Sequence, residues 1–417
     1  MKIKYIKIVN FRNINSFECN DLSNMNIFAG INGAGKTTVI NAIKILLSWL
    51  AARIRNSKGN GLPITNEDIK IGQPYCFLKI VLDNGVSWQI YKQRTSVRTT
   101  PIDKTDFSGL KEYADLLAEQ SQKSGIPLIS AYGVNRVIKD TPTRIRKTNM
   151  HSPLDAISVT MDNSANFHDF FIWYREMEDI ENANFREAGK LVLDPRLQAV
   201  RKAIYSISSD YTDFSVKRTS PMGFTIKKNG IKFNFRDLSD GEKAYLTLVM
   251  DIARKLSMTH PDIDNPLEAD GIIIVDEIDL HLHPTWQREV ISMLKSTFSN
   301  CQFILTTHSS HIVSSVNSFE NDKLFVISNG EVECVETNLY GLESDMVLSE
   351  VFNMTSLRNP QVQEHIDKVT KCLASNDFTS DEFNTNLSWL KDRVSHSDAI
   401  FANINLKIAL LKKQKAS

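Results

Sequence analysis

The chain has 417 residues, of which 42% are hydrophobic, and this length is sufficient for more than one hydrophobic core. Lysine and arginine balance aspartate and glutamate at 49 each, so the net charge does not indicate a nucleic-acid partner, although it is compatible with a local basic surface. The five cysteines form no CxxC pair, which is typical of unpaired thiols in the cytoplasm. The most apolar run, residues 43–52, has about half the length that spans a bilayer, so no membrane segment is expected.

The first predicted elements are strands and one long helix. Residues 1–9 alternate lysine with apolar side chains and predict a first strand. A helix is predicted over residues 36–54, which carry apolar side chains at helical spacing. Asn84 and Gly85 predict a hairpin over residues 79–91, with a tight turn whose two central residues both have positive φ. The same dipeptide predicts two further hairpins, over residues 224–235 and 325–335.

The middle of the chain is predicted to be mostly helical. Aromatic and charged side chains fill residues 167–187, and Pro195 begins a helical pattern that continues to Ile207. We expect these helices to form a lobe inserted into the main fold. The pattern contains no sustained heptads, which excludes a long coiled coil.

A glycine-rich run at residues 30–37 lies between a predicted strand and a predicted helix. Glycines allow successive backbone N–H groups to surround a phosphate at the positive end of the helix. Lys36 adds a charge on the β- and γ-phosphates, and Thr37 would place its hydroxyl on Mg²⁺. The alternative is a glycine turn without a ligand. The expected nucleotide contacts are Asn32, Gly33, Ala34, Gly35, Lys36, Thr37 and Thr38.

A second candidate region ends in two carboxylates. The β-branched residues 271–275 predict a strand buried on both faces of a parallel sheet, and Asp276 and Glu277 follow at its carboxyl end. Asp276 would hold Mg²⁺ through water, and Glu277 would accept a proton from the attacking water. The alternative is an acidic strand end in a surface loop.

Ser239 and Glu242 form a capping-box pattern at the start of a helix predicted to continue to about Met258. The structural interpretation is only a helix cap. The functional interpretation is that Ser239 and the Gly241 N–H contact the γ-phosphate of an ATP molecule held by a second copy of the chain. The position of this pattern between the glycine loop and the two carboxylates favours the functional interpretation.

The glycine loop, the run Leu238–Lys243, residues 272–277 and residues 306–309 resemble the ABC-type ATPase head of SMC, RecF and OLD-type proteins. This resemblance implies a head-to-tail homodimer that encloses two ATP molecules. It also implies that His308 is a switch histidine at the γ-phosphate, so that Glu277, His308 and Lys36 are the catalytic residues. The family's D-loop falls on residues 279–284, where Asp279, His281 and His283 leave a zinc site as an alternative.

A closer resemblance comes from residues 238–254, 276–288 and 303–313, which are similar to PtuA-like ATPases of Septu and retron anti-phage systems. The implied fold is α/β: an ABC-ATPase head, with a parallel-sheet core and an antiparallel β-subdomain, an inserted helical lobe and a C-terminal helical appendage. The expected domains are the N-terminal half of the head (1–95), the helical insertion (96–222), the C-terminal half of the head (223–345) and the appendage (346–417).

The resemblance implies an ATP- and Mg²⁺-dependent regulatory subunit whose oligomeric state controls a separate nuclease of the HNH or PtuB type. About 70 residues follow Asp345 and they are predicted to be helical, so no nuclease domain is expected in this chain. The alternative is a RecF-like DNA-binding repair ATPase without a nuclease partner. In that case residues 53–58 and the cluster Arg144, Arg146 and Lys147 would contact phosphates.

Two positions depart from the family pattern or are ambiguous in it. The Q-loop glutamine is not evident, and Asn135 or Arg136 is the candidate replacement. Arg12 follows Phe11 and matches a Phe-Arg pair that often lies near the nucleotide in RecF-like heads. The alternative for Arg12 is an exposed side chain in a strand turn.

Overall fold

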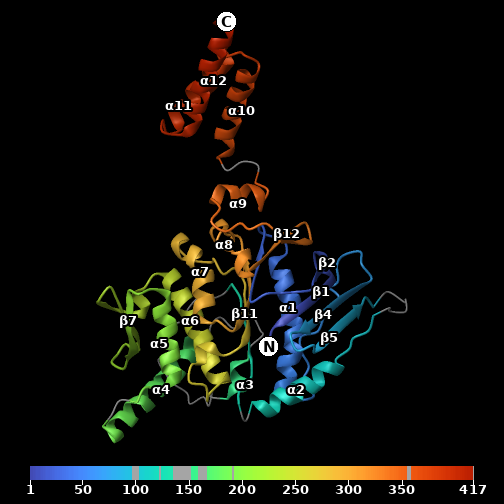
Figure 1. The fold of residues 1–417 in the computed structure, drawn as a ribbon, viewed down its shortest axis with the longest axis vertical. Coiled ribbons are helices and arrows are strands. Elements are labelled where there is room, and N and C mark those ends of the chain that lie inside the picture. The colour runs from blue at the N-terminus through green and yellow to red at the C-terminus, as the bar shows by residue number, and fades with distance from the viewer. Residues whose placement is uncertain are drawn as a thin grey trace. The chain divides into compact units, whose positions relative to one another are not determined.

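The computed structural model describes residues 1–95, 103–121, 124–134, 152–157, 167–189, 192–354 and 358–416. The chain divides into two compact units, residues 1–347 and residues 348–417. Unit 1 contains three β-sheets and their covering helices, and unit 2 is a bundle of helices (Figure 1). The predicted α/β class is therefore confirmed.

A six-stranded sheet forms the centre of unit 1, with the order β13-β12-β3-β11-β10-β6. Neighbouring strands are parallel except for β12 and β13, which form an antiparallel hairpin. Parallel strands end at one edge of the sheet, so the segments after β3, β10 and β11 meet there. The strands are β3 (Met25–Ala29), β6 (Leu128–Tyr132), β10 (Gly271–Val275), β11 (Cys301–Thr307), β12 (Lys323–Ser328) and β13 (Glu331–Val335).

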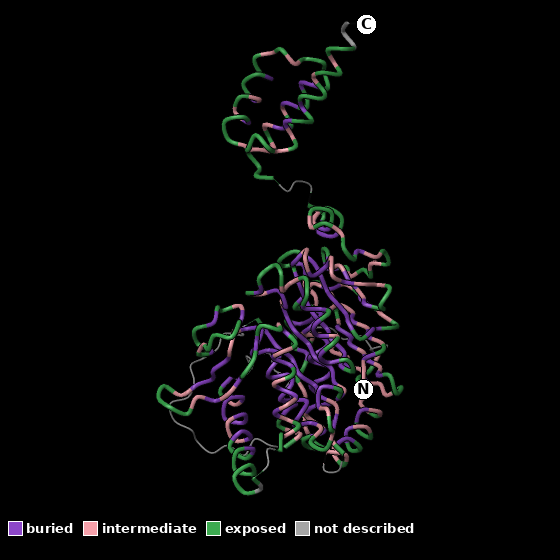
Figure 2. Tube along the Cα trace, turned by 60° about the vertical axis from the view of Figure 1, so that its left-hand side comes forward, coloured by how far each residue is buried: buried purple, intermediate pink, exposed green. Residues whose placement is uncertain are grey.

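The central strands are buried on both faces, and for β10 the β-branched sequence predicts this burial. Every residue of β3, β6, β10 and β11 is buried. Figure 2 shows this concentration of buried chain within unit 1. The helices that flank the strand ends and bear on the site are α1 (Lys36–Arg55), α6 (Asp240–Thr259) and α7 (Pro284–Thr297).

Helix α1 is long and apolar because it is a core helix. Among the described residues it is a helix whose length and hydropathy would allow a membrane span, but 72% of its apolar window is buried inside the structure. Trp88 packs over it and donates its indole N–H to the Leu46 carbonyl at 3.0 Å.

A four-stranded antiparallel sheet, with the order β2-β1-β4-β5, packs against α1. The predicted hairpin between β4 and β5 is present, but its turn differs from the prediction. Gly85 has φ 84°, whereas Asn84 does not have a positive φ, because the loop contains four residues and is closed by a bond from Leu82 N to Val86 O of 2.8 Å. The strands are β1 (Ile3–Phe11), β2 (Ile14–Cys19), β4 (Tyr75–Leu82) and β5 (Ser87–Gln93).

A three-stranded antiparallel sheet, β7-β8-β9, packs against helix α4 (Phe167–Ala188) through a cluster of aromatic rings around Phe224, and helix α5 (Pro195–Ile207) contacts β7. Its β8–β9 hairpin has the predicted tight turn, with φ of 51° at Asn229 and 77° at Gly230. The β12–β13 hairpin has the same turn, with φ of 51° at Asn329 and 82° at Gly330. The strands are β7 (Tyr211–Lys217), β8 (Gly223–Lys228) and β9 (Ile231–Asn234).

The region predicted as a helical insertion, residues 96–222, is not a separate lobe throughout. Its strand β6 pairs in parallel with β10 and is an edge strand of the central sheet. The reason is that all five residues of β6 are buried, as in a strand covered on both faces. The remaining described helices of this region are α2 (Ser108–Gln120) and α3 (Pro153–Ala156).

Short α8 (Ser310–Val313) lies between β11 and β12. Every described element after β13 is a helix, and the first of them, α9 (Ser344–Glu350), spans the boundary between the two units. Unit 2 consists chiefly of α10 (Pro360–Ala374), α11 (Asp381–Arg393) and α12 (Ala399–Ala416). These helices enclose a small core of their own, formed by Ile366, Val369, Cys372, Leu373, Phe383, Leu390, Phe401 and Ile404.

Candidate functional site

The glycine loop connects β3 to α1 at the carboxyl edge of the central sheet. Gly35 adopts φ 116°, and a Cβ at this position would lie 2.6 Å from the Asn13 amide nitrogen, so only glycine fits without strain. The same Asn13 amide donates to the Ala34 carbonyl at 3.0 Å. Asn13 comes from the turn between β1 and β2, so the antiparallel sheet holds the loop in shape.

Lys36 is only 5% exposed and bends back over the loop. Its ammonium group donates to the carbonyls of Gly30 at 2.8 Å and Ile31 at 3.0 Å. Burial lowers the pKa of Lys36, and the nearby carboxylates Glu277, Asp279 and Asp276 oppose this shift. The charge of Lys36 therefore lies within the loop. A bound phosphate group would compete with the two carbonyls for the hydrogen bonds of the ammonium group.

Thr37 and Asp276 are in direct contact. The Thr37 hydroxyl donates to Asp276 Oδ2 at 2.9 Å, and the Thr306 hydroxyl donates to the other oxygen, Oδ1. The contact joins the start of α1 to the end of β10. The two residues predicted to bind Mg²⁺ are thus brought together at the mouth of the loop, and both present the oxygen ligands that Mg²⁺ prefers.

Glu277 has a left-handed backbone, with φ 48°. Few residues other than glycine adopt this conformation, and such strain is concentrated at functional sites. Its N–H donates to the Thr306 hydroxyl at 2.7 Å. Thr306 therefore contacts both acidic residues and fixes the turn that follows β10.

His308 follows β11 at the same sheet edge, and its side chain is 46% exposed. Its Nδ1 lies 3.0 Å from Asp279 Oδ2, while the Thr307 hydroxyl donates to Asp279 Oδ1 at 2.6 Å. The side chain of Asp279 is 2% exposed. This buried carboxylate orients the imidazole through Nδ1 and leaves Nε2 as the nitrogen that could reach a ligand.

The zinc alternative gains no support from these contacts. Asp279 is committed to His308 and Thr307, and His283 caps α7 by accepting from the Thr285 N–H at 3.3 Å. Across the described part of the chain, no group of three or more His, Cys, Asp and Glu side chains could hold a metal ion.

Ser239 lies at the exposed N-terminus of α6 and forms both halves of the predicted capping box with Glu242. Gly241 approaches the D-loop, because a Cβ there would lie 2.2 Å from the His281 carbonyl oxygen. The start of α6 is therefore packed directly against the segment that follows Glu277 in the same chain.

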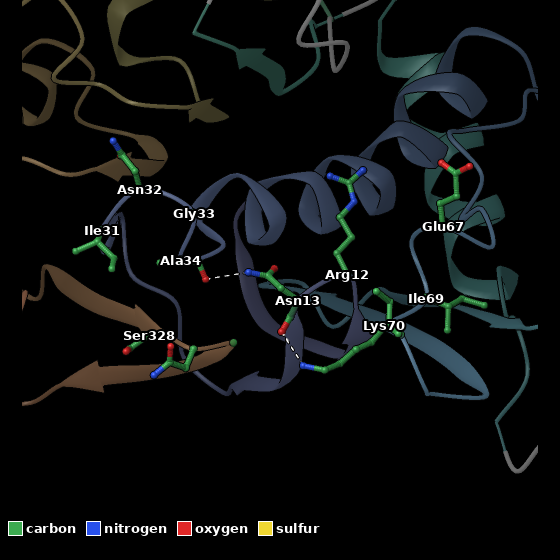
Figure 3. Close-up of a pocket in the computed structure, with 13 residues that line it drawn as sticks. Arg12, Asn13, Ile31, Asn32, Gly33, Ala34, Glu67, Ile69, Lys70 and Ser328 are labelled. Carbon is green, nitrogen blue, oxygen red and sulfur yellow. Dashed lines mark hydrogen bonds between the residues drawn. The ribbon is translucent and has the colours of Figure 1, made fainter.

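A cavity of about 720 Å³ opens beside the glycine loop (Figure 3). None of its lining residues belongs to the Ser239–Gly241 segment. Arg12 lines it with a backbone φ of 50°, and its guanidinium Nε contacts Asp68 at 2.9 Å. The lining consists of Arg12, Asn13, Ile31, Asn32, Gly33, Ala34, Glu67, Ile69, Lys70, Ile71, Ser328, Asn329 and Gly330.

Burial raises the pKa of Asp68, but hydrogen bonds from Thr65 and Arg12 outweigh it and lower that pKa overall. The ionised carboxylate anchors Arg12 beside the cavity. Predicted contacts Arg12, Asn32, Gly33 and Ala34 therefore line the same cavity, as Figure 3 shows.

Sequence reasoning missed Asn13, the Arg12 partner Asp68, and the cavity residues Glu67, Ile69, Lys70 and Ile71. No local motif marks these residues. The turn at Asn329 was predicted, but its place at the cavity follows only from the pairing of β12 beside β3. The candidate Q-loop residues Asn135 and Arg136, and the basic cluster Arg144, Arg146 and Lys147, lie outside the described residues.

The other basic candidate cluster, residues 53–58, is partly occupied by contacts within the chain. Arg55 donates to the carbonyls of Leu154 and Ile157. Arg53 lies over the rings of Trp49 and Phe107, at 5.9 and 5.1 Å from their centroids. These two arginines therefore stabilise the packing of α1 against its neighbours.

Comparison with known proteins gives consistent matches. The family model described as "AAA domain, putative AbiEii toxin, Type IV TA system" matches residues 25–314. The chain is 28% identical over 413 residues to "Retron Ec83 probable ATPase" of Escherichia coli, covering 84% of this chain and 74% of that protein. It is 30% identical over 347 residues to "Retron Vc95 probable ATPase" of Vibrio cholerae, covering 71% and 68%. It is 23% identical over 400 residues to "Septu protein PtuA" of Bacillus thuringiensis, covering 89% of each.

Proposed function

This chain belongs to the AAA-domain family whose model spans residues 25–314, and we propose that it binds and hydrolyses ATP in a composite site that a second copy of the chain completes. The matches to retron and Septu ATPases confirm the family predicted from the motifs. The observation that carries the proposal is the contact between Thr37 and Asp276, which closes the glycine loop against the end of β10.

The triphosphate of ATP would lie in the loop formed by residues 30–37. Backbone N–H groups of the loop would donate to the phosphates. The N-terminus of α1, which carries the positive end of the helix dipole, would face the same phosphates. Lys36 would exchange its two carbonyl contacts for the β- and γ-phosphates. The adjoining cavity, lined by Arg12, Asn13 and Lys70, is large enough for the nucleoside half of the ligand.

Thr37 and Asp276 fit a magnesium ion, because a hydroxyl and a carboxylate oxygen already meet at 2.9 Å beside the phosphate loop. Bound there, Mg²⁺ would neutralise charge on the β- and γ-phosphates. Thr306 positions Asp276 by donating to its second oxygen.

Glu277 would take the proton from the attacking water, since it follows Asp276 at the end of β10 and has the strained backbone typical of functional sites. His308, oriented by Asp279, would donate a hydrogen bond to the γ-phosphate as negative charge develops. Lys36 completes the set of charged groups around the transferred phosphoryl group.

In the proposed site a second copy supplies Ser239 and Gly241, neither of which lines the cavity of its own chain. Ser239 is exposed at a helix N-terminus, where a hydroxyl and backbone N–H groups favour an anion. In a head-to-tail pair, this end of α6 would contact the γ-phosphate held by the other chain.

Two substitutions test this assignment. Glu277→Gln should lower ATP turnover about 100- to 10,000-fold while preserving ATP binding, and it should trap the pair of chains. Lys36→Ala should abolish binding. Turnover is measured by phosphate release, binding by calorimetry and pairing by light scattering. Normal hydrolysis by the Glu277→Gln variant would overturn the assignment of the base.

We further propose that the chain is a cytoplasmic regulatory subunit in anti-phage defence, which controls a separate nuclease through its ATP-dependent oligomeric state. The support is the likeness to retron and Septu ATPases, together with a C-terminal unit whose described elements are all helices. A nuclease domain of the type found in OLD proteins would need an α/β domain with clustered carboxylates.

The test is affinity purification of the tagged chain from its native host, followed by mass spectrometry and a nuclease assay. A co-purifying nuclease whose activity changes with the Glu277→Gln variant supports the proposal. ATP-stimulated, salt-sensitive DNA binding by the chain alone, with no nuclease present, would instead favour the DNA-repair alternative.

A further inference from the structure

The carboxylate of Glu242 receives four hydrogen bonds. The Ser239 backbone N–H and hydroxyl donate to its Oε2 at 3.0 and 2.8 Å. The Tyr211 hydroxyl and the Lys228 ammonium donate to its Oε1 at 2.7 and 2.6 Å. Glu242 is 8% exposed, so this group of contacts connects the start of α6 to β7 and β8.

These contacts engage the proton of the Ser239 hydroxyl. A serine hydroxyl has one proton to donate, and in this structure that proton points to Glu242. Its oxygen accepts from the Glu242 N–H at 3.3 Å. To donate to a γ-phosphate, the hydroxyl must rotate and break its bond to Glu242.

Lys228 and Tyr211 also donate to the Glu242 carboxylate, so they determine how much of its stabilisation is lost when the Ser239 hydroxyl leaves. Burial raises the pKa of Glu242, but the hydrogen bonds from Lys228, Tyr211 and Ser239 outweigh it and lower the pKa to about 2. Glu242 is therefore ionised at neutral pH. Three of its four donors remain in place if the Ser239 hydroxyl leaves.

We propose that Glu242 is a positioning residue that holds the Ser239 hydroxyl away from the nucleotide in the single chain. Lys228 and Tyr211 make it easier for the hydroxyl to leave Glu242 when the ATP bound to a second copy arrives. This inference rests on the composite site proposed above. The β7-β8-β9 sheet thereby influences the affinity of one chain for another without contacting ATP itself.

Two substitutions should act in opposite directions. Glu242→Gln weakens the acceptor of the serine proton, so the chains should pair at an ATP concentration about three- to tenfold lower. Lys228→Met removes a competing donor and leaves the carboxylate more dependent on Ser239, so pairing should need about three- to tenfold more ATP. Tyr211→Phe should change pairing in the same direction as Lys228→Met.

The experiment uses the full chain in a Glu277→Gln background, in which ATP is not consumed, and measures pairing by light scattering across an ATP titration. Lys227→Met is the matched control, because Lys227 is the neighbouring lysine on β8 and pairs with Asp213 at 3.0 Å instead. ATP affinity of the single chain, measured by calorimetry at a protein concentration too low for pairing, should be unchanged in all variants.

If Glu242→Gln and Lys228→Met both weaken pairing, the contacts only support the fold and the inference is overturned. A Ser239→Ala background sharpens the result, because the effect of Lys228→Met should disappear there. If that effect persists in the Ser239→Ala background, the inference fails as well. Absence of any ATP-dependent pair in the Glu277→Gln protein would overturn the composite site itself, which separates the two failures.

Discussion

The Thr37 hydroxyl and the Asp276 carboxylate are 2.9 Å apart although 239 positions separate them in the chain. This contact joins the first turn of α1 to the end of β10. Asp276→Asn should lower ATP turnover at least about 100-fold, because the amide carries no charge for Mg²⁺ and accepts through only one atom.

The measurement is turnover across a Mg²⁺ titration, and the Asp276→Asn variant should need more Mg²⁺ for half-maximal activity. Asp322→Asn serves as the control, because Asp322 is a buried carboxylate that pairs with Lys295 at 2.8 Å and has no proposed role at the nucleotide. An unchanged Mg²⁺ requirement in the Asp276→Asn variant would contradict the assignment of Asp276.

Asp279→Asn should lower kcat about 10- to 100-fold and leave KM nearly unchanged, because it disturbs the orientation of His308 without removing a predicted nucleotide contact. The matched control is Asp322→Asn. Asp322 is another buried carboxylate, but it pairs with Lys295 at 2.8 Å. Equal losses of kcat in the two variants would show that the effect reports general stability.

Arg12→Ala should weaken ATP binding about three- to tenfold, since it removes a cation from the wall of the cavity beside the glycine loop. Isothermal titration calorimetry measures the dissociation constant directly. Arg186→Ala provides the control, because Arg186 is exposed on α4 and does not line the cavity. Unchanged affinity in the Arg12→Ala variant would place the nucleoside elsewhere.

The lowered pKa of Glu242, about 2 against an ordinary value of 4.5, predicts a pH-dependent contribution to stability. The folded state favours the ionised carboxylate, so the contribution is complete above pH 4.5 and is lost as pH falls toward 2. Glu242→Gln should therefore be less stable than the unmodified chain at pH 7, and the difference should narrow below pH 4.5. Urea titrations at several pH values measure the free energies, and a constant difference would contradict the prediction.

Local signals were sufficient to predict much of the fold. Asn-Gly turns placed three hairpins, and the helical pattern of residues 195–207 matches α5 at both ends. The turn at Asn84 was wrong in detail, because loop length and strand register determine its geometry and the dipeptide alone does not. Strand β6 was assigned to an insertion because its partner β10 is distant in the chain.

At the candidate site, too, local motifs predict some residues, whereas contacts between distant segments are not predicted. Five predicted site residues follow strands whose carboxyl ends meet, so the structure brings them to one edge of the sheet: Lys36, Thr37, Asp276, Glu277 and His308. Their chemical roles remain proposals. The pairing of Asp279 with His308 depends on side-chain orientation, which motif spacing does not reveal. The cavity residues Glu67, Ile69, Lys70 and Ile71 come from a connecting segment, and such segments carry no periodic signal.

The left-handed backbone of Glu277 has a consequence for the evolution and engineering of this chain. A non-glycine residue in this conformation is destabilised by roughly 1 kcal/mol, and glycine or asparagine would relieve part of that strain. Either replacement would also remove the proposed base. Selection for thermal resistance alone should therefore favour replacements of Glu277 that inactivate the protein. At this residue, higher stability and ATP hydrolysis exclude each other.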